Sequence, residues 1–219
     1  GEKLYAAARE LSPDGRELNL SLWAPPPLQA HWNWPGHEGK ELPVEVYSRH
    51  DSVRLYLNDK LLGEKPTTVA EEFKAVFAVP YTPGTLRAVG VDAGHETETF
   101  TLATTGPAVA LRLSNDRNTL YADGQDLAFV TIEAVDATGR VVPQANDSVT
   151  YTLTGPGIIA GIGSADVTTT ESYRDNPRKI FQGRAILVIR TQGVAGEIIL
   201  KATAPGLSLG TLSLKSNAP

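Results

Sequence analysis

Short runs in which apolar and polar residues alternate at every second position constrain the fold of this chain more than any other feature. A strand points successive side chains to opposite faces, so this period predicts β-strands that bury one face. Gly, Pro, Asn or Asp bounds the runs, and no long stretch shows a helical period. The runs lie at 18–22, 44–47, 53–58, 73–77, 129–133, 149–153, 185–189 and 198–202. Many short strands at this spacing predict an all-β protein built of sandwiches.

Residues that favour tight turns separate these runs. Turns are predicted at 12–15, 58–59, 82–84 and 136–139, where Pro, Gly, Asn and Asp cluster. The glycine-rich stretch 155–163 predicts a bend or bulge in a strand. The stretch 68–74 is too short for an independent helix. We predict that it forms a loop or a single turn leading into a strand that contains Phe73.

The length of 219 residues suits two domains of about 100 residues each. The best boundary is Thr104-Thr105-Gly106-Pro107, which separates two alternating runs. Residues 1–104 hold 10 basic and 15 acidic side chains, whereas residues 105–219 hold 10 of each. This difference in surface charge favours two sandwiches over one. The predicted domains are therefore 1–104 and 105–219.

Composition excludes several classes of function. The chain has a net charge of −5 and no Cys. Disulfides, thiolate metal sites and cysteine nucleophiles are thus excluded, and nothing forms a basic footprint for nucleic acid. No apolar run approaches the roughly 18 residues that span a membrane. Because the sequence begins at Gly1 as if inside a domain and lacks Met, we expect a fragment of a longer chain.

Two of the three tryptophans, Trp32 and Trp34, lie in the segment His31-Trp32-Asn33-Trp34-Pro35-Gly36. The stiff sequence Pro25-Pro26-Pro27 precedes it. Exposed indoles suit stacking on sugar faces, so carbohydrate binding is one hypothesis. Burial at a domain interface is the favoured one, because aromatic rings dominate core and interface energetics. If the segment is a strand, both indoles point the same way, and we expect one ring buried and the other partly exposed.

The histidines form no metal-binding pattern. His31, His37, His50 and His95 are scattered along the chain, and no third ligand accompanies the closest pair. We therefore predict no zinc site and no cofactor.

Paired carboxylates are the groups that glycoside hydrolysis needs. The candidate pairs are Glu71-Glu72, Glu96/Glu98 and Asp123/Asp126. Glu96 and Glu98 are expected to project from one strand face into solvent, and Asp123-Gly124-Gln125-Asp126 is expected to form a turn, with calcium binding as an alternative. None of the pairs has a recognisable pocket, so the sequence predicts no catalytic residue.

Two blocks of sequence resemble a known family. The first runs from His31-Trp32-Asn33-Trp34-Pro35-Gly36 through Val53-Arg54-Leu55-Tyr56-Leu57-Asn58-Asp59 to Val79-Pro80-Tyr81-Thr82-Pro83-Gly84-Thr85-Leu86-Arg87-Ala88-Val89-Gly90. The second runs from Ala122-Asp123-Gly124-Gln125-Asp126 through Val142-Pro143 and Gly155-Pro156-Gly157 to Gly183-Arg184-Ala185. In order and spacing, the blocks resemble the two immunoglobulin-like domains that follow the catalytic barrel in bacterial glycoside hydrolase family 2 enzymes of the β-galactosidase type. Asn58-Asp59 departs from the pattern, since the family more often has Asn-Gly there.

The resemblance implies two tandem immunoglobulin-like β-sandwiches that form a non-catalytic accessory region. The family hydrolyses terminal β-linked sugars with two glutamates on a barrel that lies outside this chain. The implied partner is therefore the catalytic barrel of the same parent chain, which these domains would brace, and the implied location is periplasmic or extracellular. Two other hypotheses remain: a free-standing carbohydrate-binding module that uses Trp32 and Trp34, and a surface adhesion module.

Overall fold

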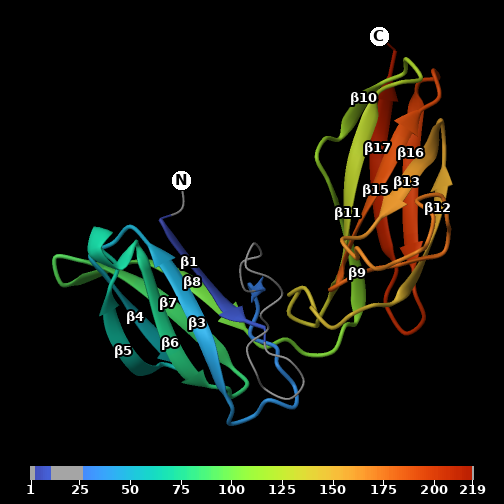
Figure 1. Cartoon of the computed structure of the whole chain (residues 1–219). Coiled ribbons are helices and arrows are strands. Elements are labelled where there is room, and N and C mark those ends of the chain that lie inside the picture. The colour runs from blue at the N-terminus through green and yellow to red at the C-terminus, as the bar shows by residue number, and fades with distance from the viewer. Residues whose placement is uncertain (1–2, 11–26, 219) are drawn as a thin grey trace. The chain divides into compact units, whose positions relative to one another are not determined.

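The computed structural model describes residues 3–10 and 27–218, which form two compact units, 1–104 and 105–219 (Figure 1). Both units are β-sandwiches, so the prediction of an all-β chain with two tandem immunoglobulin-like sandwiches is confirmed. The predicted strand at 18–22, the turn at 12–15, and Pro25 and Pro26 lie outside the described residues. No helix in the described part of the chain is long and apolar enough to cross a membrane.

The described residues of unit 1 form two four-stranded sheets. One has the order β2-β1-β3-β6 and contains Leu28–Gln29, Leu4–Arg9, Glu41–Ser48 and Lys74–Pro80. The other has the order β5-β4-β7-β8 and contains Lys60–Pro66, Ser52–Leu57, Thr85–Asp92 and His95–Ala103. Val44 and Val46 of β3 are fully buried, as are Val53 and Leu55 of β4. The alternating residues of the two sheets thus meet in one apolar core.

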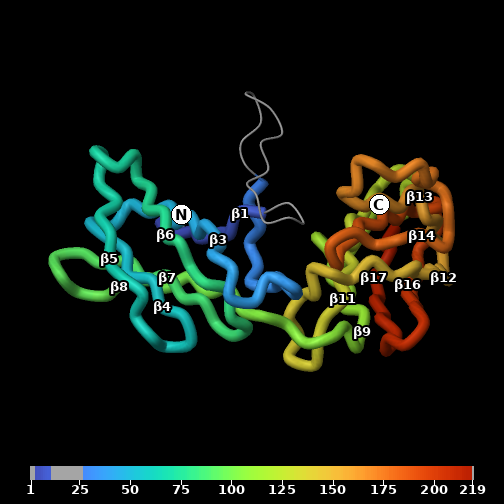
Figure 2. Tube along the Cα trace, turned by 60° about the horizontal axis from the view of Figure 1, so that its bottom comes forward, coloured from blue at the N-terminus to red at the C-terminus, as the bar shows by residue number. Residues whose placement is uncertain are grey.

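Unit 2 has a five-stranded and a four-stranded sheet. Figure 2 traces the chain through most of their strands. The first has the order β10-β17-β16-β12-β14, with bounds Thr119–Tyr121, Gly210–Asn217, Gly196–Thr203, Ser148–Thr154 and Arg178–Lys179. The second has the order β13-β15-β11-β9, with bounds Gly157–Gly163, Arg184–Thr191, Leu127–Val135 and Ala110–Asn115. The pair β10–β17 is parallel, and the other strand pairs are antiparallel.

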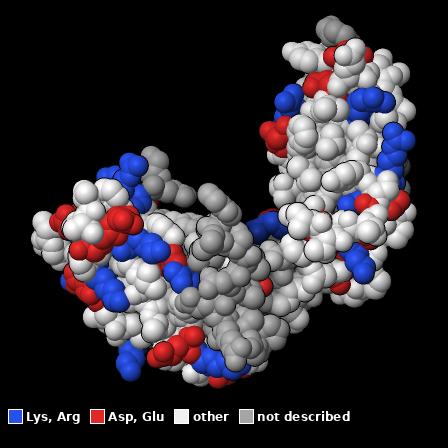
Figure 3. All heavy atoms as spheres, viewed as in Figure 1, with Lys and Arg blue, Asp and Glu red and all other residues white. Residues whose placement is uncertain are grey.

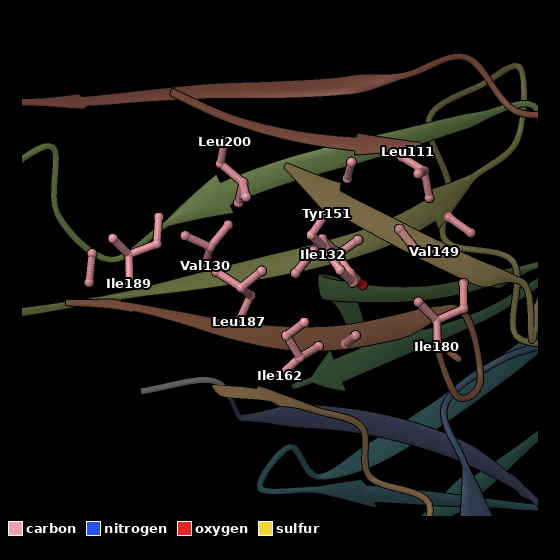
Figure 4. Packing of buried hydrophobic residues seen from close by; sticks show 14 of the residues in the cluster. Leu111, Val130, Ile132, Val149, Tyr151, Ile162, Ile180, Leu187, Ile189 and Leu200 are labelled. Carbon is pink, nitrogen blue, oxygen red and sulfur yellow. The ribbon is translucent and has the colours of Figure 1, made fainter. Parts of the chain in front are cut away.

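Alternation places the core of unit 2 between its sheets. Val130 and Ile132 of β11 are fully buried, whereas Phe129 on the same strand is 43% exposed. Figure 4 shows Leu187 of β15 beside Val130, with Leu200 of the facing sheet across the core. Side chains of both signs mix over the visible surface of each unit (Figure 3).

The predicted turns mostly form as expected. Asn58 and Asp59 have φ angles of 49° and 62°, the two positive values that a type I′ hairpin turn requires. The bulge predicted in the glycine-rich stretch is also present, because the register of β13 shifts between Ile159 and Gly161. Asp136 organises its turn by accepting hydrogen bonds from the Thr138 hydroxyl and from backbone N–H groups, which lower its pKa to about 2.

The segment 68–74 differs in part from the prediction. Val69–Glu71 forms a single 3-10 turn, which the Thr68 side chain caps. The strand β6 begins only at Lys74, so the prediction that Phe73 belongs to it is wrong. Phe73 instead has a φ of 60° and is 44% exposed, because the chain leaves the turn in the left-handed region.

Gly155→Ala is expected to destabilise unit 2 by about 3 kcal/mol, and Gly206→Ala by about 1 kcal/mol. Both glycines have positive φ, but only at Gly155 would a Cβ meet a backbone atom, the Glu197 oxygen at 2.0 Å. Urea unfolding followed by circular dichroism measures both losses. All three tryptophans precede residue 105, so their fluorescence reports on unit 1 and should show an unchanged transition. Equal losses for the two variants would contradict this account.

Candidate functional site

The tryptophan segment 31–37 is a loop between β2 and β3. Trp32 is fully buried, and its Nε1 donates a hydrogen bond to the carbonyl oxygen of Thr82 at 2.9 Å. Its ring packs edge-on against Tyr81, with 5.2 Å between the ring centroids. The Thr104 hydroxyl donates to the Trp32 carbonyl oxygen at 2.6 Å. Trp32 therefore fixes the loop to the connection between β6 and β7 and to the end of unit 1.

Trp34 lies between two histidines. The His31 ring centroid is 4.8 Å from that of Trp34, and the His37 centroid is 6.3 Å away. Among the described residues, neither Trp34 Nε1 nor either ring nitrogen of His37 has a hydrogen-bond partner, although these atoms are buried. A buried polar group without a partner costs about 1–3 kcal/mol. These three residues, His31, Trp34 and His37, are called the His–Trp–His cluster below.

The charge state of the cluster follows from burial. Burial lowers the pKa of His31 to about 4, and the nearby carboxylate of Glu10 opposes this shift only in part. The Nδ1 atom of His31 accepts a hydrogen bond from the backbone N–H of Asn33 at 3.2 Å. Both observations describe a neutral imidazole at pH 7.

The two tryptophans do not form the arrangement expected from a strand. The segment is a loop, and Asn33 is buried as well, so the indoles do not share one face. Trp32 is buried as expected of one ring, but the expected partial exposure of the other is wrong, because Trp34 is 8% exposed. The loop turns each ring toward a different set of neighbours. The exposed pair of coplanar rings that a sugar platform needs is not present in this segment.

A bulge in β8 changes the positions of the predicted acid pair Glu96/Glu98. The register between β7 and β8 shifts between Val89 and Val91, so that Thr97 and Glu98 together oppose Gly90. Each extra residue in a strand reverses the alternation of the residues that follow. The expectation that the two glutamates share a face is therefore wrong.

The two glutamates have separate partners. Glu96 forms an ion pair with Arg54 on β4, at 3.1 Å. Glu98 lies 3.3 Å from Nε2 of His50, a histidine that is 5% exposed. Hydrogen bonds from Tyr56 and Arg54 lower the pKa of Glu96, so this carboxyl is ionised at neutral pH. Neither glutamate faces the other across a cleft.

The other predicted candidates have local structural roles. Glu71 accepts hydrogen bonds from Thr68 in the capping box of the 3-10 turn. Asp123 accepts from the backbone N–H groups of Gln125 and Asp126, which gives the predicted turn. Within residues 3–10 and 27–218, no three His, Asp or Glu side chains are grouped so that they could hold a metal ion. His95 is an exposed residue at the start of β8.

Comparison with known proteins finds a matching family model in each unit. Residues 111–213 match the family model described as glycoside hydrolase family 2 C-terminal domain 5, and residues 39–98 match a domain of unknown function, DUF4982. A crystal structure of a glycosyl hydrolase family 2 member from Bacteroides cellulosilyticus superposes with a TM-score of 0.90 and 34% identity, over 98% of this chain and 28% of that one. The chain belongs to glycoside hydrolase family 2.

Curated relatives in glycoside hydrolase family 2 include β-galactosidase BoGH2A of Bacteroides ovatus, which is 33% identical over 86% of this chain and 22% of its own length. A β-glucuronidase of Formosa agariphila is 33% identical over 90% of this chain and 20% of its own length. The chain thus spans about a fifth of the length of these relatives. It corresponds to the C-terminal, immunoglobulin-like region of the family, as the sequence resemblance implied.

The sequence alone did not predict the His–Trp–His cluster of this family 2 region. His31 and His37 were considered only as metal ligands, and each lies three positions from Trp34. A histidine on both sides of a tryptophan at that spacing was the available signal. In a loop, however, spacing alone does not show which rings meet.

Trp32→Phe is expected to destabilise unit 1 by about 1 kcal/mol more than Trp34→Phe. Both changes shrink a buried ring in the same way, but only the first breaks a hydrogen bond, and a hydrogen bond contributes about 0.5–1.5 kcal/mol. Urea unfolding followed by circular dichroism measures both free energies of unfolding. A larger loss for Trp34→Phe would refute the assignment.

The stability of unit 1 is expected to fall as the pH drops from about 6.5 to about 4. The pKa of His31 is about 4 in the folded state, and that of an unfolded histidine is about 6.5. The unfolded state therefore binds more protons in this window, and protonation favours unfolding. An NMR titration gives the pKa directly, and His31→Phe should remove this part of the pH dependence. A His31 pKa near 6.5 would show that the imidazole is not buried as described.

Proposed function

We propose that this chain is the non-catalytic accessory region of a longer glycoside hydrolase family 2 enzyme that hydrolyses terminal β-linked sugars. The observation that carries the proposal is the match to the Bacteroides cellulosilyticus family member, in which this chain covers 28% of the structure. Relatives named β-galactosidase and β-glucuronidase support a β-galactoside or a β-glucuronide as the substrate. In this proposal the catalytic barrel lies in the remainder of the parent chain.

The role proposed for the two sandwiches is to brace that barrel through the His–Trp–His cluster. Its buried Trp34 Nε1 is a hydrogen-bond donor that has no acceptor among the described residues. Buried polar groups in folded proteins are almost always paired. Because this N–H is already covered in the chain, the 31–37 loop would have to shift on assembly for an oxygen on the catalytic barrel to accept from Trp34 and complete the cluster. Trp32 stabilises the position of Trp34, because its hydrogen bond to Thr82 fixes the 31–37 loop to the sandwich of unit 1.

The 219-residue chain is expected not to hydrolyse nitrophenyl β-galactoside or nitrophenyl β-glucuronide above the rate in buffer. The longer enzyme that contains the chain is expected to hydrolyse at least one of them. A chromogenic assay of both proteins measures this difference. Turnover by the 219-residue chain that survives repurification and is lost in Glu96→Gln or Glu98→Gln would overturn the proposal.

The bracing role is tested by comparing one variant in two contexts. Trp34→Phe removes only the N–H and part of the ring, so in the longer enzyme it leaves the proposed barrel acceptor unpaired. The loss of melting temperature is therefore expected to be larger in the longer enzyme than in the 219-residue chain. Trp32→Phe is the matched control, since its hydrogen bond lies within unit 1 and its effect should be the same in both. Equal effects of Trp34→Phe in both contexts would exclude this contact.

A further inference from the structure

A second feature of unit 1 lies on the outer side of the sheet formed by β1 and β3. An open cavity of about 480 Å³ is lined by Tyr5, Tyr47 and Phe73, with Lys3 and Arg49 among the remaining residues. Small-molecule sites have volumes of about 300–1,000 Å³ and combine apolar surface with a few polar groups. The three rings are 40%, 36% and 44% exposed, in that order. These rings are therefore partly available to a ligand.

Pairing between strands fixes two of the rings. Tyr5 and Tyr47 are directly opposite each other on β1 and β3, so their side chains lie on the same face. The Tyr5 ring also packs against Phe100, with 5.2 Å between centroids. The Tyr47 hydroxyl donates a hydrogen bond to Glu45, and Lys74 Nζ lies 5.8 Å from the centroid of the Tyr47 ring. Both rings thus keep their positions without a ligand.

The third ring, that of Phe73, belongs to a residue with a strained backbone. Phe73 has a φ of 60°, and a bulky residue rarely adopts this conformation. Such strain costs about 1–3 kcal/mol and is found preferentially at ligand-binding sites. Its carbonyl oxygen accepts from the backbone N–H of Ser48, and its own N–H donates to Thr68, so the surrounding chain maintains the conformation. Glycine would relieve the strain, yet this position has a phenyl ring at the cavity.

The charge beside the rings is positive. Among the described residues, neither Lys3 nor Arg49 forms a salt bridge, and a backbone hydrogen bond from Arg49 N to Lys3 O holds the two side by side. Carboxylates lie near Lys3, since its backbone N–H donates to Glu98 at 3.3 Å and its charge helps to lower the pKa of Asp92. Neither carboxylate forms a salt bridge with the Lys3 ammonium group. An anionic ligand would provide their counter-charge.

We propose that this cavity binds an acidic oligosaccharide, whose sugar faces stack on Tyr5, Tyr47 and Phe73 and whose carboxylate or sulfate groups pair with Lys3 and Arg49. The electron-rich faces of the rings attract the polarised C–H groups of a pyranose. The guanidinium of Arg49 suits a planar carboxylate, with which it can form two parallel hydrogen bonds. The site is separate from the His–Trp–His cluster and does not depend on the proposed contact with the barrel.

Calorimetric titration of the 219-residue chain with two ligands of equal length tests the proposal. Tetragalacturonate carries carboxylates, and its methyl ester has the same sugar faces without the charge. Tetragalacturonate is expected to bind at least tenfold more tightly than the ester at low ionic strength, and less tightly in about 0.15 M salt. A κ-carrageenan tetrasaccharide and its desulfated form test sulfate in the same way. Equal binding of the charged and neutral forms in both pairs, or no binding at all, would overturn the proposal.

Variants separate the two parts of the site. Phe73→Gly is expected to weaken binding at least tenfold without lowering the melting temperature, because glycine accepts the positive φ. The double change Lys3→Ala and Arg49→Ala should abolish the preference for the charged ligand. Phe129→Ala, which removes an exposed ring of similar accessibility in unit 2, is the matched control and should leave binding unchanged. Unchanged binding by Phe73→Gly would refute the site.

The same titration of the longer enzyme shows whether the cavity is open in the whole protein. Binding with the same preference for the charged ligand is expected. Binding that is present in the 219-residue chain and absent from the longer enzyme would mean that another domain covers the rings, and would overturn the proposal. The result is independent of the melting experiment on Trp34, so the two proposals can fail separately.

Discussion

Most strands in the described part of this chain bury one of their faces against a second sheet. The strands have at most nine residues, and isolated hairpins of this length are marginally stable in water. Apolar side chains at alternate positions remove the inner face from water when two sheets pack together. Val44 and Val46 meet Val53 and Leu55 in this way in unit 1. Each unit therefore needs both of its sheets, and the outer faces remain free for polar residues and contacts.

Trp32 extends this packing to a loop that has no strand to hold it. Its indole is fully buried, and its N–H is paired with the Thr82 carbonyl, so the core of unit 1 includes part of the 31–37 loop. The same anchoring fixes Trp34 and its two histidines with polar atoms that lack partners. The stable packing of Trp32 thus holds the buried Trp34 and its two histidines in place. This arrangement fits an accessory region of glycoside hydrolase family 2 better than a sugar platform of paired indoles.

The functional hypotheses lie where the local pattern of the sequence is broken. Phe73 continues an alternating run by sequence, but the left-handed backbone at Glu72 and Phe73 turns its ring to the surface. In β8 an extra residue sends Glu96 and Glu98 to different partners. Natural proteins depart from local consistency mainly at functional or strained sites. The cavity of Tyr5, Tyr47 and Phe73 has the first kind of feature, and the side chains of Lys3 and Arg49 beside it form no salt bridge among the described residues.

The sequence by itself determined the all-β class, the strands, most of the turns and the family, because alternation and turn chemistry act over a few neighbouring residues. Asn58-Asp59 specifies its turn in this way, since both residues tolerate positive φ. Only the tertiary structure decided which side chains meet across strands. Tyr5 and Tyr47 are 42 positions apart and become neighbours through the register of β1 and β3. A single bulge shifts such a register by one residue and reverses the face of every side chain beyond it. Long-range strand pairing therefore determines the sites, and the spacing of residues in the sequence does not encode this pairing.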